Sequence, residues 1–181
     1  LLYRVTNMIR KLLMDIKRLT ILKFLVLSTV LCVCVTLLLT YLLIIISESF
    51  GWSEPYNAES SEVFSVSDGL LTIGLIFPAI ETVLIIFLCL LLSQIGCGTK
   101  ATGLIVTTAF AIIHGFIIPE KFINSFFYFL IFVFSYLHWK KASLFKGVTA
   151  AFVPHSIMNS VLVVLIHFFP NKLRGLCCIR L

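Results

Sequence analysis

Five long apolar stretches dominate the sequence and constrain the fold more than any other feature. They cover roughly residues 21–47, 70–95, 102–118, 122–139 and 145–169. A helix that crosses a bilayer needs about 20 mostly apolar residues, and only the third stretch is short by that measure. Together the stretches take up more than half of the 181 residues, which leaves no room for a soluble domain. We therefore expect an all-α fold, a polytopic transmembrane helix bundle with about five spans.

The composition excludes several classes of protein. Hydrophobic residues make up 60% of the chain and charged residues only 12%, whereas a soluble domain is about half apolar and a quarter charged. This excludes a soluble globular protein, a disordered chain and a nucleic-acid-binding module. The lipid bilayer is the expected environment.

The charges flanking the first stretch differ in sign on its two sides. Six basic residues precede or open it: Arg4, Arg10, Lys11, Lys17, Arg18 and Lys23. Five acidic residues follow it: Glu48, Glu54, Glu59, Glu62 and Asp68. Because basic residues collect on the cytoplasmic side of a membrane, we expect the N-terminus to be cytoplasmic and the acidic loop external. Five spans would then put the basic tail outside, against this rule, so either one stretch does not span or the tail is an exception.

These patterns divide the chain into four parts. Residues 1–20 combine basic side chains with apolar ones at helical spacing, which is typical of an amphipathic segment at a membrane surface. Residues 21–68 form the first transmembrane helix and the acidic loop, residues 69–169 the membrane core, and residues 170–181 a basic tail. The six cysteines lack the paired spacing of a zinc or redox site. We interpret them as small buried hydrophobic residues.

Ionisable residues within apolar stretches are rare here, and each is a candidate functional residue because burying a charge in a membrane is costly. Glu81 lies in the second stretch, His114 in the third and His155 in the fifth. Counted from the cytoplasmic ends, their depths are about 21, 18 and 15 Å at 1.5 Å per residue. Asn159 follows His155 by four residues and shares its helix face. The sequence therefore predicts one polar site near the middle of the bilayer.

Two kinds of chemistry fit this set of side chains. Glu81 could act as a general base that takes a proton from water, while the histidines orient the water or stabilise an oxyanion. Glu81, His114 and His155 could equally hold a divalent metal such as Zn²⁺ with an open water position. The residues leave these two alternatives open.

The order of these residues resembles the CAAX protease and bacteriocin-processing family (CPBP, or Abi). Its pattern is Glu-Glu-x-x-x-Arg, then Phe-x-x-x-His, then His-x-x-x-Asn. The last two elements are present as Phe110 to His114 and as His155 to Asn159, and the resemblance covers about residues 69–169. It implies an intramembrane endopeptidase that cleaves a membrane-associated protein or peptide, in a bacterial plasma membrane. Glu81 and His114 would activate the water, and His155 and Asn159 would stabilise the oxyanion.

The first element departs from the family pattern. Thr82 replaces its second Glu, and Ile86 replaces its Arg. This leaves a second hypothesis, in which the chain is a non-catalytic relative that binds a peptide or a partner protein, as in bacteriocin immunity or complex assembly. A proton relay or small transporter is disfavoured because five spans without an internal repeat are unusual for one.

Three smaller predictions concern neighbouring residues. We expect the Thr82 hydroxyl to bond within its own helix. Pro78 and Pro154 either open the helix backbone near the site or form simple kinks. The fourth stretch is rich in aromatic residues, and we expect these to face lipid: Phe122, Phe126, Phe127, Tyr128, Phe129, Phe132, Phe134 and Tyr136.

Overall fold

The computed structural model describes residues 20–49, 65–117 and 121–168, and almost all of these residues lie in helices. In chain order the elements are α2 (Ile21–Ser49), α3 (Val66–Leu71), η2 (Thr72–Ile76), α4 (Phe77–Gln94), α5 (Thr99–Ile117), α6 (Lys121–Trp139) and α7 (Leu144–Phe168). No strand occurs in this part of the chain, so the all-α prediction is confirmed. The predicted amphipathic segment, most of the acidic loop and the basic tail lie outside the described residues.

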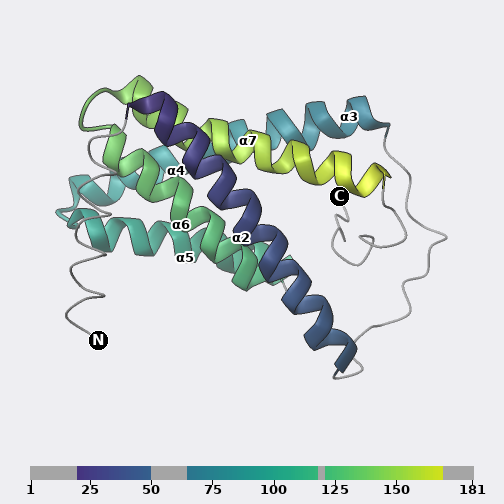
Figure 1. Ribbon diagram of the computed structural model, residues 1–181. Helices are drawn as coiled ribbons and strands as arrows, with labels where there is room; N and C mark the ends of the chain where they lie inside the picture. The colour runs from purple at the N-terminus through teal and green to yellow at the C-terminus, as the bar shows by residue number, and fades with distance from the viewer. Residues whose placement is uncertain (1–19, 50–64, 118–120, 169–181) are drawn as a thin grey trace, which may run out of the picture.

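Within the described residues, five helical segments are long and apolar enough to cross a membrane, in agreement with the predicted number of spans. They are Ile21–Leu42, Val66–Gln94, Thr99–Phe116, Lys121–Trp139 and Leu144–Phe168. The second span joins α3, η2 and α4 end to end, while the short third one starts at Thr99, earlier than predicted. Both tight turns, α4–α5 and α6–α7, lie at the end of the bundle where α2 begins (Figure 1). The protein is therefore an integral membrane protein with a multi-pass helix bundle.

The first span shows how the bundle sorts its side chains. Leu22, Val26 and Val30 of α2 are exposed, while Ser28, Thr36 and Thr40 of the same helix are buried. Large apolar residues on the outside and small polar residues between helices are expected where lipid replaces water around the protein. The Thr40 hydroxyl accepts a hydrogen bond of 2.8 Å from Asn124 Nδ2, which joins α2 to α6.

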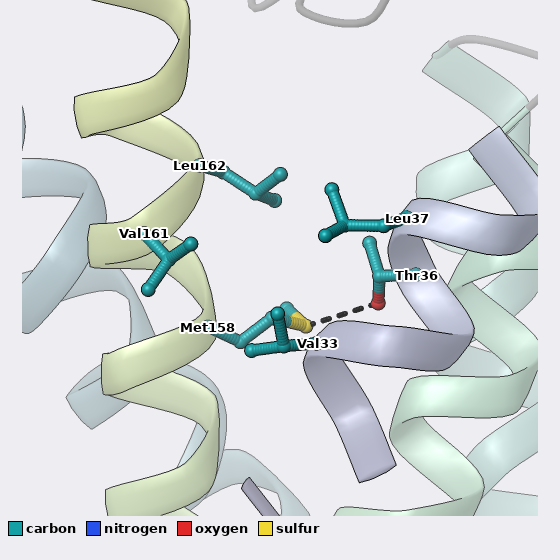
Figure 2. A pocket seen from close by; sticks show the side chains of 6 residues that line it. All are labelled: Val33, Thr36, Leu37, Met158, Val161 and Leu162. Atoms are coloured by element: carbon teal, nitrogen blue, oxygen red, sulfur yellow. Dashed lines mark hydrogen bonds between the residues drawn. The ribbon is translucent and has the colours of Figure 1, made fainter. Parts of the chain in front are cut away.

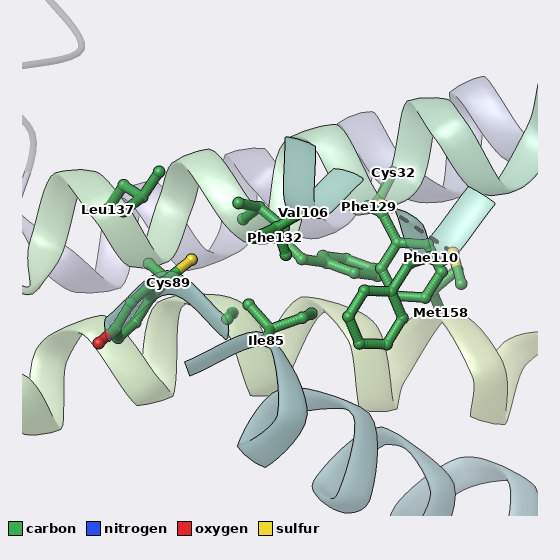
Figure 3. Close-up of a cluster of buried hydrophobic side chains, with 12 residues drawn as sticks. Cys32, Ile85, Cys89, Val106, Phe110, Phe129, Phe132, Leu137 and Met158 are labelled. Carbon is green, nitrogen blue, oxygen red and sulfur yellow. Dashed lines mark hydrogen bonds between the residues drawn. The ribbon is translucent and has the colours of Figure 1, made fainter. Parts of the chain in front are cut away.

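Helix α6 lies at the centre of the bundle and packs against α2, α4, α5 and α7. Phe129, Phe132 and Tyr136 are fully buried and belong to the core cluster drawn in Figure 3, where the first two are labelled. Their spacing of three and four residues puts them on one face of the helix. The prediction that these aromatics face lipid is therefore wrong for the core face, whereas Phe122 and Phe127 are exposed as expected.

The cysteine prediction holds for two of the four described cysteines. Cys32 and Cys89 are fully buried, and the Cys32 thiol lies 3.8 Å from the sulfur of Met158 on α7. Cys97 is half-buried in the α4–α5 turn. Cys34 is exposed, so the prediction is wrong there, because two residues along a helix turn the side chain to nearly the opposite face. Cys177 and Cys178 lie outside the described residues.

A shallow groove with no room for a water molecule lies between α2 and α7 (Figure 2), and its lining is Val33, Thr36, Leu37, Met158, Val161 and Leu162. The Thr36 hydroxyl donates a hydrogen bond of 3.4 Å to the Met158 sulfur across it. None of these six side chains is ionisable. The candidate site lies elsewhere, between α4, α5 and α7.

Candidate functional site

Glu81 is the centre of the candidate site. It lies one turn into α4, which opens with Phe77 and Pro78. Its side chain is 22% exposed, and the neighbouring Ile80 and Val83 point outward. The two carboxylate oxygens contact different histidines from different helices. An ionisable group at mid-span thus has partners on both sides, as membrane-embedded charges require.

His114 faces one oxygen of this carboxylate from the last turn of α5. Its Nε2 lies 3.5 Å from Glu81 Oε1, and its side chain is 25% exposed. Its Nδ1 lies 3.0 Å from the carbonyl oxygen of Phe110, one turn earlier. A carbonyl only accepts hydrogen bonds, so Nδ1 carries a proton. At the Nε2–Oε1 contact, a direct hydrogen bond then needs one further proton, either on the imidazole or on the carboxyl group.

His155 contacts the other oxygen from the middle of α7. Its Nε2 lies 3.2 Å from Glu81 Oε2, and its side chain is only 2% exposed. Its Nδ1 is buried and has no hydrogen-bond partner among the described residues. A bare acceptor is tolerated better than a buried N–H without a partner. We therefore assign the proton of a neutral His155 to Nε2, which donates to the carboxylate.

Aromatic rings of α6 enclose the histidines. The Phe132 ring stacks on His155 with centroids 4.4 Å apart and an interplanar angle of 21°. The Phe129 ring lies 5.0 Å from His114 and 5.8 Å from His155. Tyr128 lies slightly farther from both, at 6.3 and 6.2 Å. These contacts exclude water from the His155 side and fix the orientation of its ring.

Sequence reasoning missed the role of these rings. The signal was present, because Phe129 and Phe132 share a helix face with the small residue Ser125 and with Tyr136. All four of these residues are buried. A stripe at this spacing indicates a face turned toward the protein interior.

Asn159 lies one turn beyond His155 and makes a different contact. Its Nδ2 donates a hydrogen bond of 3.1 Å to the carbonyl oxygen of Ile73, in η2. The hydroxyl of Ser156 donates to the neighbouring carbonyl, that of Gly74. The structure thus brings Glu81, His114 and His155 together and places Asn159 against the backbone that precedes α4.

The two positions that depart from the family pattern are apolar or without a partner. Thr82 is 2% exposed, and its hydroxyl has no hydrogen-bond partner in the described part of the chain. The prediction of a bond within its own helix is therefore wrong, because the hydroxyl reaches no carbonyl of the preceding turn. Ile86 packs against the hydrophobic core.

A metal would have to be held by the same three side chains. No group of three or more His, Cys, Asp or Glu side chains among the described residues is arranged to hold one. Instead, each Nε2 atom faces its own carboxylate oxygen at hydrogen-bonding or ion-pair distance. The geometry of Glu81, His114 and His155, here called the triad, therefore fits proton transfer better than metal binding.

The arrangement leaves Glu81 and His114 as the two members of the triad that are accessible and able to accept a proton. Glu81 and His114 are both about a quarter exposed, whereas His155 is closed off. Glu81 Oε1 and His114 Nε2, a basic oxygen and a basic nitrogen, face each other there across 3.5 Å.

No family model matches the chain, and no curated protein or solved structure matches it either.

Proposed function

We propose that the protein is an intramembrane endopeptidase that hydrolyses peptide bonds of membrane-associated proteins or peptides. One observation carries the proposal: Glu81 at mid-span contacts two histidines from two other helices. Structural carboxylates in membranes need one partner, whereas general acid–base chemistry needs a base together with groups that orient and stabilise. The resemblance to the CPBP family, carried by Phe110 to His114 and His155 to Asn159, supports the same chemistry.

The attacking water binds at the open side of the triad. With Nδ1–H of His114 donated to Phe110, a neutral His114 presents a lone pair at Nε2. Two acceptors 3.5 Å apart, Nε2 and Glu81 Oε1, are suited to take both hydrogens of one water molecule. Glu81 takes one proton, and the water oxygen forms a bond to the carbonyl carbon of the substrate. The π electron pair of the carbonyl moves to its oxygen.

His155 stabilises the resulting oxyanion. Its Nε2–H already points at the carboxylate, and it turns to the oxyanion when Glu81 becomes protonated and is a weaker acceptor. When the C–N bond breaks, the proton held by Glu81 passes to the leaving amine. Carboxyl and amine products form, and the triad returns to its starting protonation state.

The proposal also includes the substrate's location and the protein's orientation in the membrane. The site lies within the spans, so the substrate is a protein or peptide held in or at the lipid bilayer. We place the protein in a bacterial plasma membrane with its N-terminus in the cytoplasm. The family resemblance supports the first assignment, and the basic residues before the first span support the second.

Cleavage of a panel of quenched prenylated and leader-type peptides by the purified protein tests the proposal. Wild type, Glu81→Ala and His155→Ala are compared with and without a chelator. Val83→Ala is the matched control, because Val83 lies on the same helix and is 64% exposed. We expect turnover by wild type and the control only, insensitive to the chelator. Unchanged turnover by Glu81→Ala would refute the mechanism, and loss on chelation would identify a metal centre instead.

A second candidate function is a non-catalytic relative that binds a peptide or a partner membrane protein. It is favoured by Thr82 and Ile86, which supply no charge where the family pattern has Glu and Arg. The double change Thr82→Glu with Ile86→Arg tests it. Proteolysis that appears only in this variant would support the binding protein over the enzyme.

A further inference from the structure

The helix backbone before Glu81 is interrupted in a specific way. Residues Thr72–Ile76 form a π-helical turn, in which the Phe77 N–H bonds to the Thr72 carbonyl five residues back. The next residue is Pro78, which has no N–H to donate. An N–H at position 78 would reach Gly74 in an α-helix or Ile73 in a π-helix. Pro78 therefore removes the N–H that one of these two carbonyls would otherwise accept.

Helix α7 supplies the missing donors. Ser156 Oγ donates to the Gly74 carbonyl, and Asn159 Nδ2 donates to the Ile73 carbonyl at 3.1 Å. Both bonds lie within the membrane spans, where no bulk water is present to replace them. Helix α7 thus gives a side-chain donor to each of the two carbonyls that an N–H at position 78 could reach.

Close approach of the two backbones makes these bonds feasible. A Cβ atom added at Gly74 would lie 2.5 Å from Ser160 Oγ and 3.5 Å from Ser160 Cα. A side chain at position 74 would require the Ser160 hydroxyl to move, so glycine suits this close approach. Pro78 and Gly74 therefore act together, because Pro78 removes a backbone donor and Gly74 allows α7 to approach the carbonyls closely.

We infer that Ser156 and Asn159 are positioning residues that clamp η2 to α7 and thereby set Glu81 against His155. Ser156 follows His155 directly in α7, and Glu81 follows Pro78 by three residues in α4. The clamp therefore ties the two backbones together beside the Glu81–His155 contact of 3.2 Å. Asn159 acts through the backbone of η2 and not on the oxyanion. The effect on cleavage rests on the proposed function, whereas the clamp itself does not.

The chain offers a matched set of variants. Ser156→Ala and Asn159→Leu each remove one donor, and Ser156→Thr keeps the hydroxyl. Ser160→Ala is the control, because Ser160 lies on the same face beside Gly74 and makes no hydrogen bond within the described residues. Pro78→Ala adds an N–H that competes with α7 for a carbonyl of η2.

Cleavage kinetics provide the first measurement. A misplaced catalytic group lowers the rate of chemistry more than it lowers substrate binding, so we expect Ser156→Ala and Asn159→Leu to reduce kcat by about tenfold to a hundredfold. KM should stay within about twofold. Ser156→Thr should restore kcat, and Ser160→Ala should match wild type. Equal kinetics for Ser156→Ala, Asn159→Leu and Ser160→Ala would overturn the inference.

Imidazole ¹⁵N resonances of the protein in lipid bilayers provide a second measurement that needs no activity. We expect Ser156→Ala and Asn159→Leu to shift the His155 Nε2 resonance and to leave those of His138 and His167 in place. If Asn159→Leu does not fold, Pro78→Ala should still shift the same resonance. Shifts in a protein that cleaves no peptide would uphold the clamp and refute the proposed protease. Unshifted resonances in Ser156→Ala and Pro78→Ala would refute the clamp.

Discussion

The two sides of the Glu81 carboxylate differ in how tightly they hold their histidine. On the α7 side, His155 is 2% exposed, lies 3.2 Å from the carboxylate and stacks on Phe132 at 4.4 Å. On the α5 side, His114 is 25% exposed, lies 3.5 Å away and is held by one backbone carbonyl. In the proposed mechanism this difference corresponds to two roles, with His155 as a fixed donor in a dry environment and His114 as a group that contacts the attacking water.

Truncating each histidine in turn tests this division and has the largest expected effect. His155→Ala opens a cavity in the core, so we expect it to lower the free energy of unfolding by about 3 kcal/mol, as for other large buried rings. His114→Ala should cost less than about 1 kcal/mol because its side chain is partly exposed. Both should slow cleavage by at least about a hundredfold. Unfolding in mixed micelles measures the loss of stability, and cleavage assays measure the loss of rate. Equal losses of stability in the two variants would contradict the difference between the α7 side and the α5 side.

Removing the stacked ring should have a smaller effect. Phe132→Leu keeps an apolar side chain but loses the stack on His155, which is worth about 1 kcal/mol. We expect cleavage to fall about tenfold if ring orientation depends on this contact. Phe127→Leu is the control, since Phe127 is 42% exposed on the same helix. Similar cleavage by both variants would mean that α6 does not orient His155.

The smallest effect is expected at Tyr128. Its ring lies about equally far from both histidines, while its hydroxyl pairs with Ser125 at 2.8 Å. Tyr128→Phe should therefore lower stability by about 1 kcal/mol and leave cleavage within about twofold of wild type. A large loss of cleavage at unchanged stability would show that the hydroxyl takes part in the chemistry.

Much of the fold could be predicted from the sequence because membrane spans are set by composition alone. The span bounds depend on apolar length, and the structure moved them by only a few residues. The proximity of Glu81, His114 and His155 could be predicted because the helical rise per residue converts a position in the sequence into a depth in the membrane. Each is also ionisable in an apolar stretch, which leaves few partners to choose from.

The remaining contacts depend on features that periodicity does not record. The bonds of Ser156 and Asn159 required knowledge of the π-helical turn in η2, because Pro78 in an uninterrupted α-helix would leave only the Gly74 carbonyl without its donor. The packing of Phe129 and Phe132 on the histidines required α6 to lie at the centre of the bundle. The aromatic residues alone do not show whether lipid or protein covers them, and the small residue Ser125 on the same face was the one sequence signal of burial.

The central claim is that Glu81 and His114 act as one unit on the same water molecule. A double-mutant cycle of Glu81→Gln and His114→Asn, read as kcat/KM for one cleaved peptide, tests it most directly. If the two groups share one proton transfer, the double variant should be no slower than the slower single variant, because the second change removes nothing further. Losses that multiply would show that the two groups act independently and would contradict the account.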